Sequence, residues 1–153
     1  MEHILKKFAY CPACGSNHFE IHNEKSKICT KCGFCFYLNP SSAVAAFIVN
    51  DKNELLVCRR GKNPAKGMLD LPGGFVDKGE TAEQALVREI KEELNLFAEN
   101  LIYLYSLPNS YRYSNFDIPT LDMFYLCSVN DFSTLQANDD VSETFFINIK
   151  NLK

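Results

Sequence analysis

The sequence lacks a long hydrophobic run. Its longest one, residues 43–49, has seven residues, whereas a helix that crosses a bilayer needs about 20. The N-terminus carries Glu2 and His3 and has no apolar segment of the kind found in signal peptides. We therefore expect no membrane-spanning helix and no membrane partner, and we expect a cytoplasmic protein.

An excess of positive charge is also absent. Lys and Arg number 16 against 19 Asp and Glu, which gives a net charge of −3. Non-specific binding to nucleic acid or to anionic lipid needs a positive field that this balance does not supply. Residues 1–35 are nevertheless net +2, and six carboxylates lie between Asp77 and Glu93. This acidic cluster calls for an explanation.

The length and composition fit a soluble protein with one main domain. A chain of 153 residues, 46% hydrophobic and 23% charged, can bury its own core and leaves room for a small appendage. Residues 1–38 are polar and rich in cysteine, whereas longer apolar runs begin at Ser41. The sequence therefore predicts a small domain over residues 1–38 and a larger one over residues 39–153.

The cysteines of the small domain have the spacing of a metal site. Seven is an odd count, and five fall within residues 11–35, which favours a metal site in a reducing compartment over a disulfide framework. Two C-x2-C-G motifs, separated by 14 residues, match a zinc ribbon, in which each turn offers two thiolates to one tetrahedral ion. The predicted zinc ligands are Cys11, Cys14, Cys29 and Cys32. Possible substitutes are Cys35, His18 and His22.

The larger domain reads as an α+β fold dominated by strands. The first two strands are expected to form a hairpin around a turn at residues 50–53, and residues 109–117 and 130–142 are expected to be loops. The expected strands cover residues 42–49, 54–59, 68–71, 101–107, 120–129 and 144–149.

One helix is expected, over residues 81–94. Apolar residues recur there at every fourth position, from Ala82 to Leu94. Thr81 and Gln84 form a capping-box pattern at its start, and Asn95 just past its end tolerates a left-handed conformation.

This helix carries three carboxylates on one face, Glu89, Glu92 and Glu93. Like charges so close together repel, which suggests a compensating cation, and hard oxygen ligands suit Mg²⁺ or Mn²⁺. A solvated acidic surface is the simpler interpretation of the spacing alone.

The wider pattern resembles the Nudix box. Gly74-x5-Glu80-x7-Arg88-Glu89-Ile90-x-Glu92-Glu93-x-Asn95-Leu96 agrees with G-x5-E-x7-R-E-U-x-E-E-x-G-U, U being aliphatic, at eight of nine specified positions. Asn95 stands where the Nudix family has glycine, and we expect the local geometry to survive because asparagine also adopts the left-handed conformation.

The resemblance implies a Nudix-type mixed β-sheet with a catalytic helix, and a hydrolase that cleaves the diphosphate linkage of a nucleoside diphosphate derivative. It implies that Glu89, Glu92 and Glu93 bind Mg²⁺ or Mn²⁺. Glu80 would support the metal shell and Arg88 would brace a glutamate, while Gly73 and Gly74 would shape the loop.

Contacts with substrate are expected from cations and aromatic residues outside the box. The candidates are Arg59, Arg60, Lys62, Lys66 and Arg112 for phosphate, and Tyr111, Tyr113 and Phe116 for a base. Surface charge and ordinary packing are the alternatives for each. Glu143 is a candidate proton acceptor, although plain loop charge explains it as well.

A zinc ribbon followed by a Nudix domain resembles the NADH pyrophosphatase branch of the family. That branch carries S-Q-P-W-P-F-P-x-S after the box, whereas residues 105–113 here read YSLPNSYRY and the chain has no tryptophan. The substrate class therefore stays open among NADH or NAD, ADP-ribose, dinucleoside polyphosphates and nucleoside triphosphates.

Two other functions and the oligomeric state also stay open. The chain could be a non-catalytic module that recognises a nucleotide or RNA, or an enzyme acting on a capped RNA end. Nudix domains usually place a second helix after the last strand, whereas this chain ends at Lys153. Either the chain is shortened at its C-terminus, or a homodimer covers this face.

Overall fold

The computed structural model describes residues 2–151. Contacts between residues divide the chain after Pro40 into two compact units. In the described part of the chain, no helix has both the length and the apolar character needed to cross a membrane.

The first unit is a small antiparallel sheet of β1 (Phe19–Asn23), β2 (Ser26–Cys29) and β3 (Cys35–Tyr37), in the order β1-β2-β3. Its apolar centre is a cluster of Cys11, Phe19 and Cys29. The buried Lys27 adds to it, since its ammonium lies 4.8 Å from the centre of the Phe19 ring and donates a 2.6 Å hydrogen bond to the Phe8 carbonyl. So few apolar side chains make a core too small to hold a fold of this size without further support.

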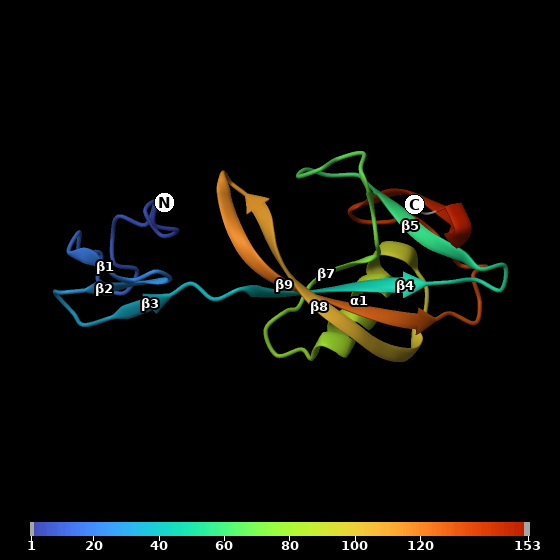
Figure 1. Ribbon diagram of the computed structural model, residues 1–153, viewed down its shortest axis with the longest axis horizontal. Coiled ribbons are helices and arrows are strands. Elements are labelled where there is room, and N and C mark those ends of the chain that lie inside the picture. Colours follow the sequence, from blue (N-terminus) through green and yellow to red (C-terminus); the bar gives the residue numbers. More distant parts are fainter. Residues whose placement is uncertain (1, 152–153) are drawn as a thin grey trace. The chain divides into compact units, whose positions relative to one another are not determined.

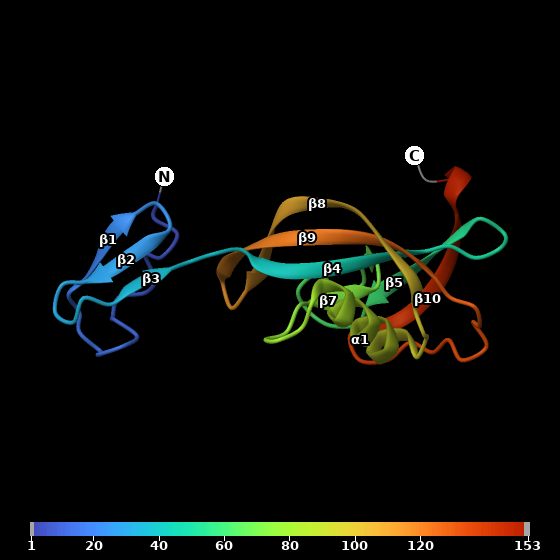
Figure 2. The same ribbon diagram turned by 90° about the horizontal axis from the view of Figure 1, so that it is seen from below.

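The described residues of the second unit form two sheets and one α-helix. Figures 1 and 2 show these elements from two sides. A mixed sheet has the order β7-β4-β9-β8, in which β4 and β9 run parallel, and an antiparallel sheet has the order β10-β5-β6. The elements are β4 (Ser41–Ile48), β5 (Glu54–Arg60), β6 (Leu69–Asp70), β7 (Gly73–Phe75), α1 (Ala82–Leu94), β8 (Glu99–Tyr113), β9 (Phe116–Ser128), β10 (Val141–Asn148) and the 3-10 turn η1 (Ile149–Asn151).

Strand β4 shows how the sequence positions the core. Val44, Ala46 and Ile48 alternate onto one face and are buried, while Ala43 and Ala45 on the other face are only half-buried. Helix α1 packs against β4 and β7 and lies beside them in Figure 2. Its buried side chains form one stripe. That stripe consists of Ala85, Leu86, Ile90 and Leu94.

Both predicted ends of the helix are confirmed. The Thr81 side chain accepts from the Gln84 backbone N–H, the Gln84 side chain accepts from the Thr81 N–H, and Asn95 adopts φ 56° and ψ 29°. Asn95 also donates a 3.1 Å hydrogen bond from Nδ2 to the Thr134 carbonyl. The asparagine therefore keeps the left-handed cap and ties the loop after β9 to the helix end.

The predicted hairpin between the first two strands is wrong. β4 is paired on its two edges by β7 and β9, and β5 by β6 and β10, so the two strands belong to different sheets. Val49, just after β4, and Leu55 in β5 form an isolated antiparallel bridge.

The predicted loop over residues 109–117 is also wrong. β8 and β9 continue through it and pair from Glu99 to Tyr113, with a turn at Ser114 and Asn115. Both turn residues have positive φ, 49° and 59°, as a two-residue hairpin turn requires. The aromatic residues of this segment favour strand, which outweighs its polar character.

Candidate active site

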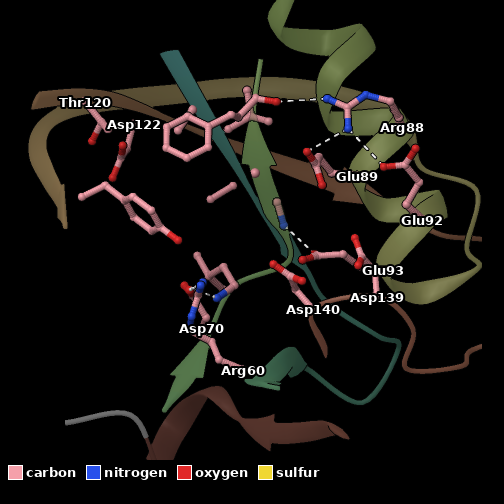
Figure 3. A pocket seen from close by; sticks show the side chains of 18 of the residues that line it. Arg60, Asp70, Arg88, Glu89, Glu92, Glu93, Thr120, Asp122, Asp139 and Asp140 are labelled. Atoms are coloured by element: carbon pink, nitrogen blue, oxygen red, sulfur yellow. Dashed lines mark hydrogen bonds and ion pairs between the residues drawn. The ribbon is translucent and has the colours of Figure 1, made fainter. Parts of the chain in front are cut away.

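A pocket of about 530 Å³ lies in the second unit (Figure 3). Its lining comes from β4, from the residues of β6 and β7, from α1, from the β8–β9 hairpin and from the turn before β10. Eight carboxylates and two guanidinium groups line it. A site of this charge suits a cation together with an anionic ligand better than an anion alone.

The helix supplies one wall of this pocket through Glu89, Glu92 and Glu93. Glu93 is buried and accepts a 3.0 Å hydrogen bond from the Gly73 N–H. Burial, reinforced by the nearby Glu89 and Asp140, raises the pKa of Glu93 to about 8. Burial likewise raises the pKa of Glu89. Carboxylates held in this way are stabilised in their charged form by a bound cation.

Arg88 braces the glutamates around it. Its guanidinium donates two hydrogen bonds to the Glu80 carboxylate, at 2.8 and 2.9 Å, one of 2.8 Å to Glu89 and one of 3.1 Å to Glu92. It also donates to the Phe75 carbonyl at 3.0 Å. The hydrogen bonds from Arg88 lower the pKa of Glu80. Glu80 is not in the lining of the pocket, so the structure places it behind Arg88 as an anchor.

The two glycines before the helix lie where a side chain does not fit. At Gly73, φ is +148° and a Cβ atom would overlap the Val44 backbone carbonyl. At Gly74, a Cβ atom would overlap the Glu89 carboxylate. Gly73 therefore permits the pairing of β7 with β4, whereas Gly74 leaves room for a side chain of the site.

Alanine substitutions at these two glycines are expected to have different effects, one on activity and the other on thermal stability. Gly74→Ala is expected to displace only the mobile end of Glu89, so that activity falls by at least about tenfold while the melting temperature changes little. Gly73→Ala meets fixed backbone and is expected to lower the melting temperature by several degrees. Thermal unfolding and steady-state kinetics on the pair check this, and a Gly74→Ala protein with unchanged activity contradicts it.

Sequence reasoning missed the acids that face the helix. Asp139 and Asp140, in the turn before β10, lie beside Glu93, and Asp70 lies close by (Figure 3). Lys62 pairs with both aspartates of the turn, at 2.8 and 2.6 Å. In the sequence, the signal for these acids was that Asp139 and Asp140 are adjacent in a predicted loop. Their place in the pocket depends on the pairing of β10 with β5, which the sequence does not reveal.

The structure brings some predicted substrate contacts to the pocket and not others. Arg60 and Tyr111 line it, and the Tyr111 ring contacts Phe75 edge-to-face at 5.3 Å. Burial acts to lower the pKa of Arg60, but hydrogen bonding to Asp70 outweighs it and the pKa is raised. Arg60 thus remains a cation inside an acidic pocket.

The other predicted contacts lie outside the lining. Arg59 pairs with Glu143 at 3.0 Å, and Arg112 pairs with Asp117 at 3.6 Å near the hairpin turn. The candidates that do not line the pocket are Arg59, Lys62, Lys66, Arg112, Tyr113, Phe116 and Glu143.

Four of the five cysteines of the first unit, the predicted zinc ligands, converge. Their sulfur atoms all lie within 4.8 Å of one another, and Sγ of Cys11 and Cys32, like Sγ of Cys14 and Cys29, are 3.7 Å apart. A tetrahedral zinc with bonds of about 2.3 Å separates its sulfurs by about 3.8 Å. Among the residues described, these four form the one group of possible metal ligands whose donor atoms lie close enough together to share an ion. Cys35, His18 and His22 lie outside it.

The two cysteine turns have the same backbone geometry. Gly15 N–H donates to the Cys11 carbonyl and Gly33 N–H to the Cys29 carbonyl, both at 2.8 Å, with φ of +70° and +77°. Burial acts to raise the pKa of Cys29, but backbone N–H groups directed at its sulfur lower it to about 7. The donor set and its geometry fit Zn²⁺.

Comparison with known proteins gives three findings. A family model described as NUDIX domain matches residues 39–153. ADP-ribose pyrophosphatase of Methanocaldococcus jannaschii is 39% identical over 118 residues, which cover 76% of this chain and 66% of that protein. NAD-capped RNA hydrolase NudC of Haemophilus influenzae is 36% identical over 112 residues, covering 71% of this chain and 41% of that protein. This chain therefore spans less than two thirds of either relative.

Solved structures agree with the family match. The crystal structure of a NUDIX hydrolase from Nitrosomonas europaea superposes with a TM-score of 0.72 at 26% sequence identity, over 92% of this chain and 78% of that one.

Proposed function

This chain belongs to the Nudix family, and we propose that it is a divalent-metal-dependent pyrophosphohydrolase that cleaves the diphosphate linkage of a nucleoside diphosphate derivative. The observation that carries the proposal is the pocket wall in which Glu89, Glu92 and Glu93 lie within one helix face, braced by Arg88 and opposed by Asp139 and Asp140.

The acidic wall fits Mg²⁺ or Mn²⁺, because these ions prefer carboxylate oxygens and complete their coordination with water and phosphate. When bound, such an ion supplies charge neutralisation at the diphosphate and lowers the pKa of a bound water. The ligands proposed from this chain are Glu89, Glu92 and Glu93, with Asp139 and Asp140 within reach of the same space.

The remaining residues of the site have proposed roles in binding and positioning. Arg88 holds the Glu89 and Glu92 carboxylates in place, and Glu80 fixes Arg88 from behind. Arg60 supplies a positive charge for a phosphate, and Tyr111 an aromatic surface for a base. Gly73 donates its N–H to Glu93 and so orients that carboxylate.

We propose a structural Zn²⁺ at Cys11, Cys14, Cys29 and Cys32, supported by the sulfur separations. The seven free cysteines favour a reducing compartment, which supports a cytoplasmic location. A homodimer is supported by the exposed apolar side chains of the edge strand β8, among them Ile102 and Leu107, which are 55% and 51% exposed. Light scattering that gives a monomer mass contradicts the dimer.

The names of the relatives narrow the choice of substrate to propose for this chain. Their names point to ADP-ribose and to NAD-type compounds, including an NAD cap on RNA. The absence of the tryptophan-containing motif at residues 105–113 makes ADP-ribose the first choice. An RNA cap remains the second candidate, favoured by the NudC matches.

A substrate panel tests the proposal. The purified full chain is incubated with Mg²⁺ or Mn²⁺, or with chelator, and with ADP-ribose, NADH, NAD, a diadenosine polyphosphate and nucleoside triphosphates. We expect metal-dependent release of a nucleoside monophosphate from a compound with a diphosphate linkage. Tight nucleotide binding without turnover of any compound would indicate a recognition module instead.

A further inference from the structure

The pocket has a second end whose chemistry differs from that of the acidic helix. Figure 3 shows Thr120 and Asp122 across the pocket from Glu89, Glu92 and Glu93. Thr120 and Asp122 share one face of β9 because they are two residues apart, and Asn109 pairs opposite Thr120 on β8. The polar group at this end thus comes from the β8–β9 hairpin, whose turn end (residues 109–117) was expected to be a loop.

The Asp122 carboxylate is held in place by Asn109. Nδ2 of Asn109 donates a 2.7 Å hydrogen bond to Oδ2 of Asp122. Oδ1 of Asn109 accepts from the Ser110 N–H at 2.8 Å, which fixes the orientation of the amide. Among the residues described, the hydrogen bond from Asn109 is the one recorded for this carboxylate, so Oδ1 of Asp122 remains available to accept from a ligand.

The surroundings favour a sugar at this end. Ala43, beside Asp122 in the sheet, and Ala45, beside Phe124, each contribute only a methyl group to the lining. Phe75, Tyr111 and Phe124 supply aromatic walls. Apolar walls with a few fixed polar groups are typical of small-molecule sites.

The Asp122 carboxylate determines which part of a nucleotide fits at this end of the pocket. An ionised carboxylate only accepts hydrogen bonds, so it needs a donor and repels a phosphate. The hydroxyls of a ribose are neutral donors, and the Thr120 hydroxyl can both donate and accept. The phosphates then lie toward the acidic helix, where a cation neutralises them.

We propose that Asn109, Thr120 and Asp122 form a subsite for the ribose hydroxyls of the substrate, and that Asp122 is the residue that selects ribose over 2′-deoxyribose. This inference rests on the proposed hydrolase function. Asn109 acts as a positioning residue, since it fixes the Asp122 carboxylate and lies on the rim of the subsite.

A symmetric probe tests the subsite whichever half of the substrate enters it. Diadenosine diphosphate and its counterpart with 2′-deoxyribose at both ends differ only in the hydroxyls. We expect the wild type to prefer the ribose probe in kcat/KM by about 10- to 100-fold, the range for a hydrogen bond to a charged group. In Asp122→Ala the preference is expected to fall to about threefold or less, because the ribose probe slows while the deoxy probe does not.

Asp117→Ala is the matched control, since Asp117 lies on the same strand, outside the pocket, and pairs with Arg112. It should keep the wild-type preference. If Asp122→Ala does not fold, Asp122→Asn keeps the shape without the charge and should weaken the preference several-fold. A wild type that does not distinguish the probes, or an Asp122 variant that slows both probes equally, overturns the subsite.

Binding separates this inference from the hydrolase proposal. Calorimetry on the metal-free protein, in which the metal-dependent hydrolysis does not proceed, gives the dissociation constants of the two probes. If neither probe nor any compound of the panel is hydrolysed but the ribose probe binds more tightly, the hydrolase function fails and the subsite stands. If hydrolysis proceeds and the two probes bind and react alike, the subsite fails and the hydrolase stands.

Discussion

Glu93→Gln is expected to reduce kcat by at least about 100-fold, the effect of removing one group that stabilises charge in an active site. Glu93 is buried among other acids, and this burial raises its pKa to about 8. Only a cation makes such a charge favourable, and a neutral amide removes the ligand while it keeps the size of the side chain. Steady-state kinetics at saturating metal, and metal titration followed by calorimetry, measure the loss.

The fold should survive this substitution. The glutamine carbonyl can still accept from the Gly73 N–H, and the neutral amide avoids the burial cost that raises the pKa of Glu93, so metal-free Glu93→Gln should melt no lower than the wild type. Glu83→Gln is the matched control on the same helix. Glu83 accepts from the Tyr125 hydroxyl at 3.1 Å, outside the pocket, and an amide keeps this hydrogen bond. Equal activity of the Glu93 and Glu83 variants would refute the proposed role of Glu93.

The parts of the fold that depend on neighbours in sequence could be predicted. The helix over residues 82–94 begins and ends where Thr81, Gln84 and Asn95 indicate, because capping is a matter of three or four adjacent residues. The convergence of the cysteines could likewise be predicted, because each pair closes its own turn. The carboxylates of α1 share one face for the same local reason.

The parts that depend on pairing between distant strands could not be predicted. The apolar runs in residues 42–49 and 54–59 indicate strands but not their partners, and the two strands join different sheets. Asp139 and Asp140 enter the pocket because β10 pairs with β5, with Val141 opposite Arg60. Asn109 reaches Asp122 because the β8–β9 strands continue through the expected loop. The acidic wall was therefore visible in the sequence and the opposite end of the pocket was not.

Removal of zinc is expected to unfold the first unit and to leave the second one folded. Among the residues described, the buried cluster of the first unit consists of Cys11, Phe19 and Cys29, and two of these three are proposed ligands. A segment of about 40 residues with so small a core needs a metal or another cross-link to fold. The second unit has its own core around α1 and β4, which contains none of the four clustered cysteines.

Cys29→Ser in the full chain tests this dependence. We expect metal analysis to find about one zinc per wild-type chain and almost none in the variant. Limited proteolysis should then cut the variant within the first 40 residues and leave a resistant fragment that starts near Ser41. Cys35→Ser is the control, because Cys35 lies outside the cluster, and it should keep zinc and resist cleavage. A Cys29→Ser protein that resists protease as the wild type does shows that the small sheet folds without the metal, so that its few apolar contacts suffice.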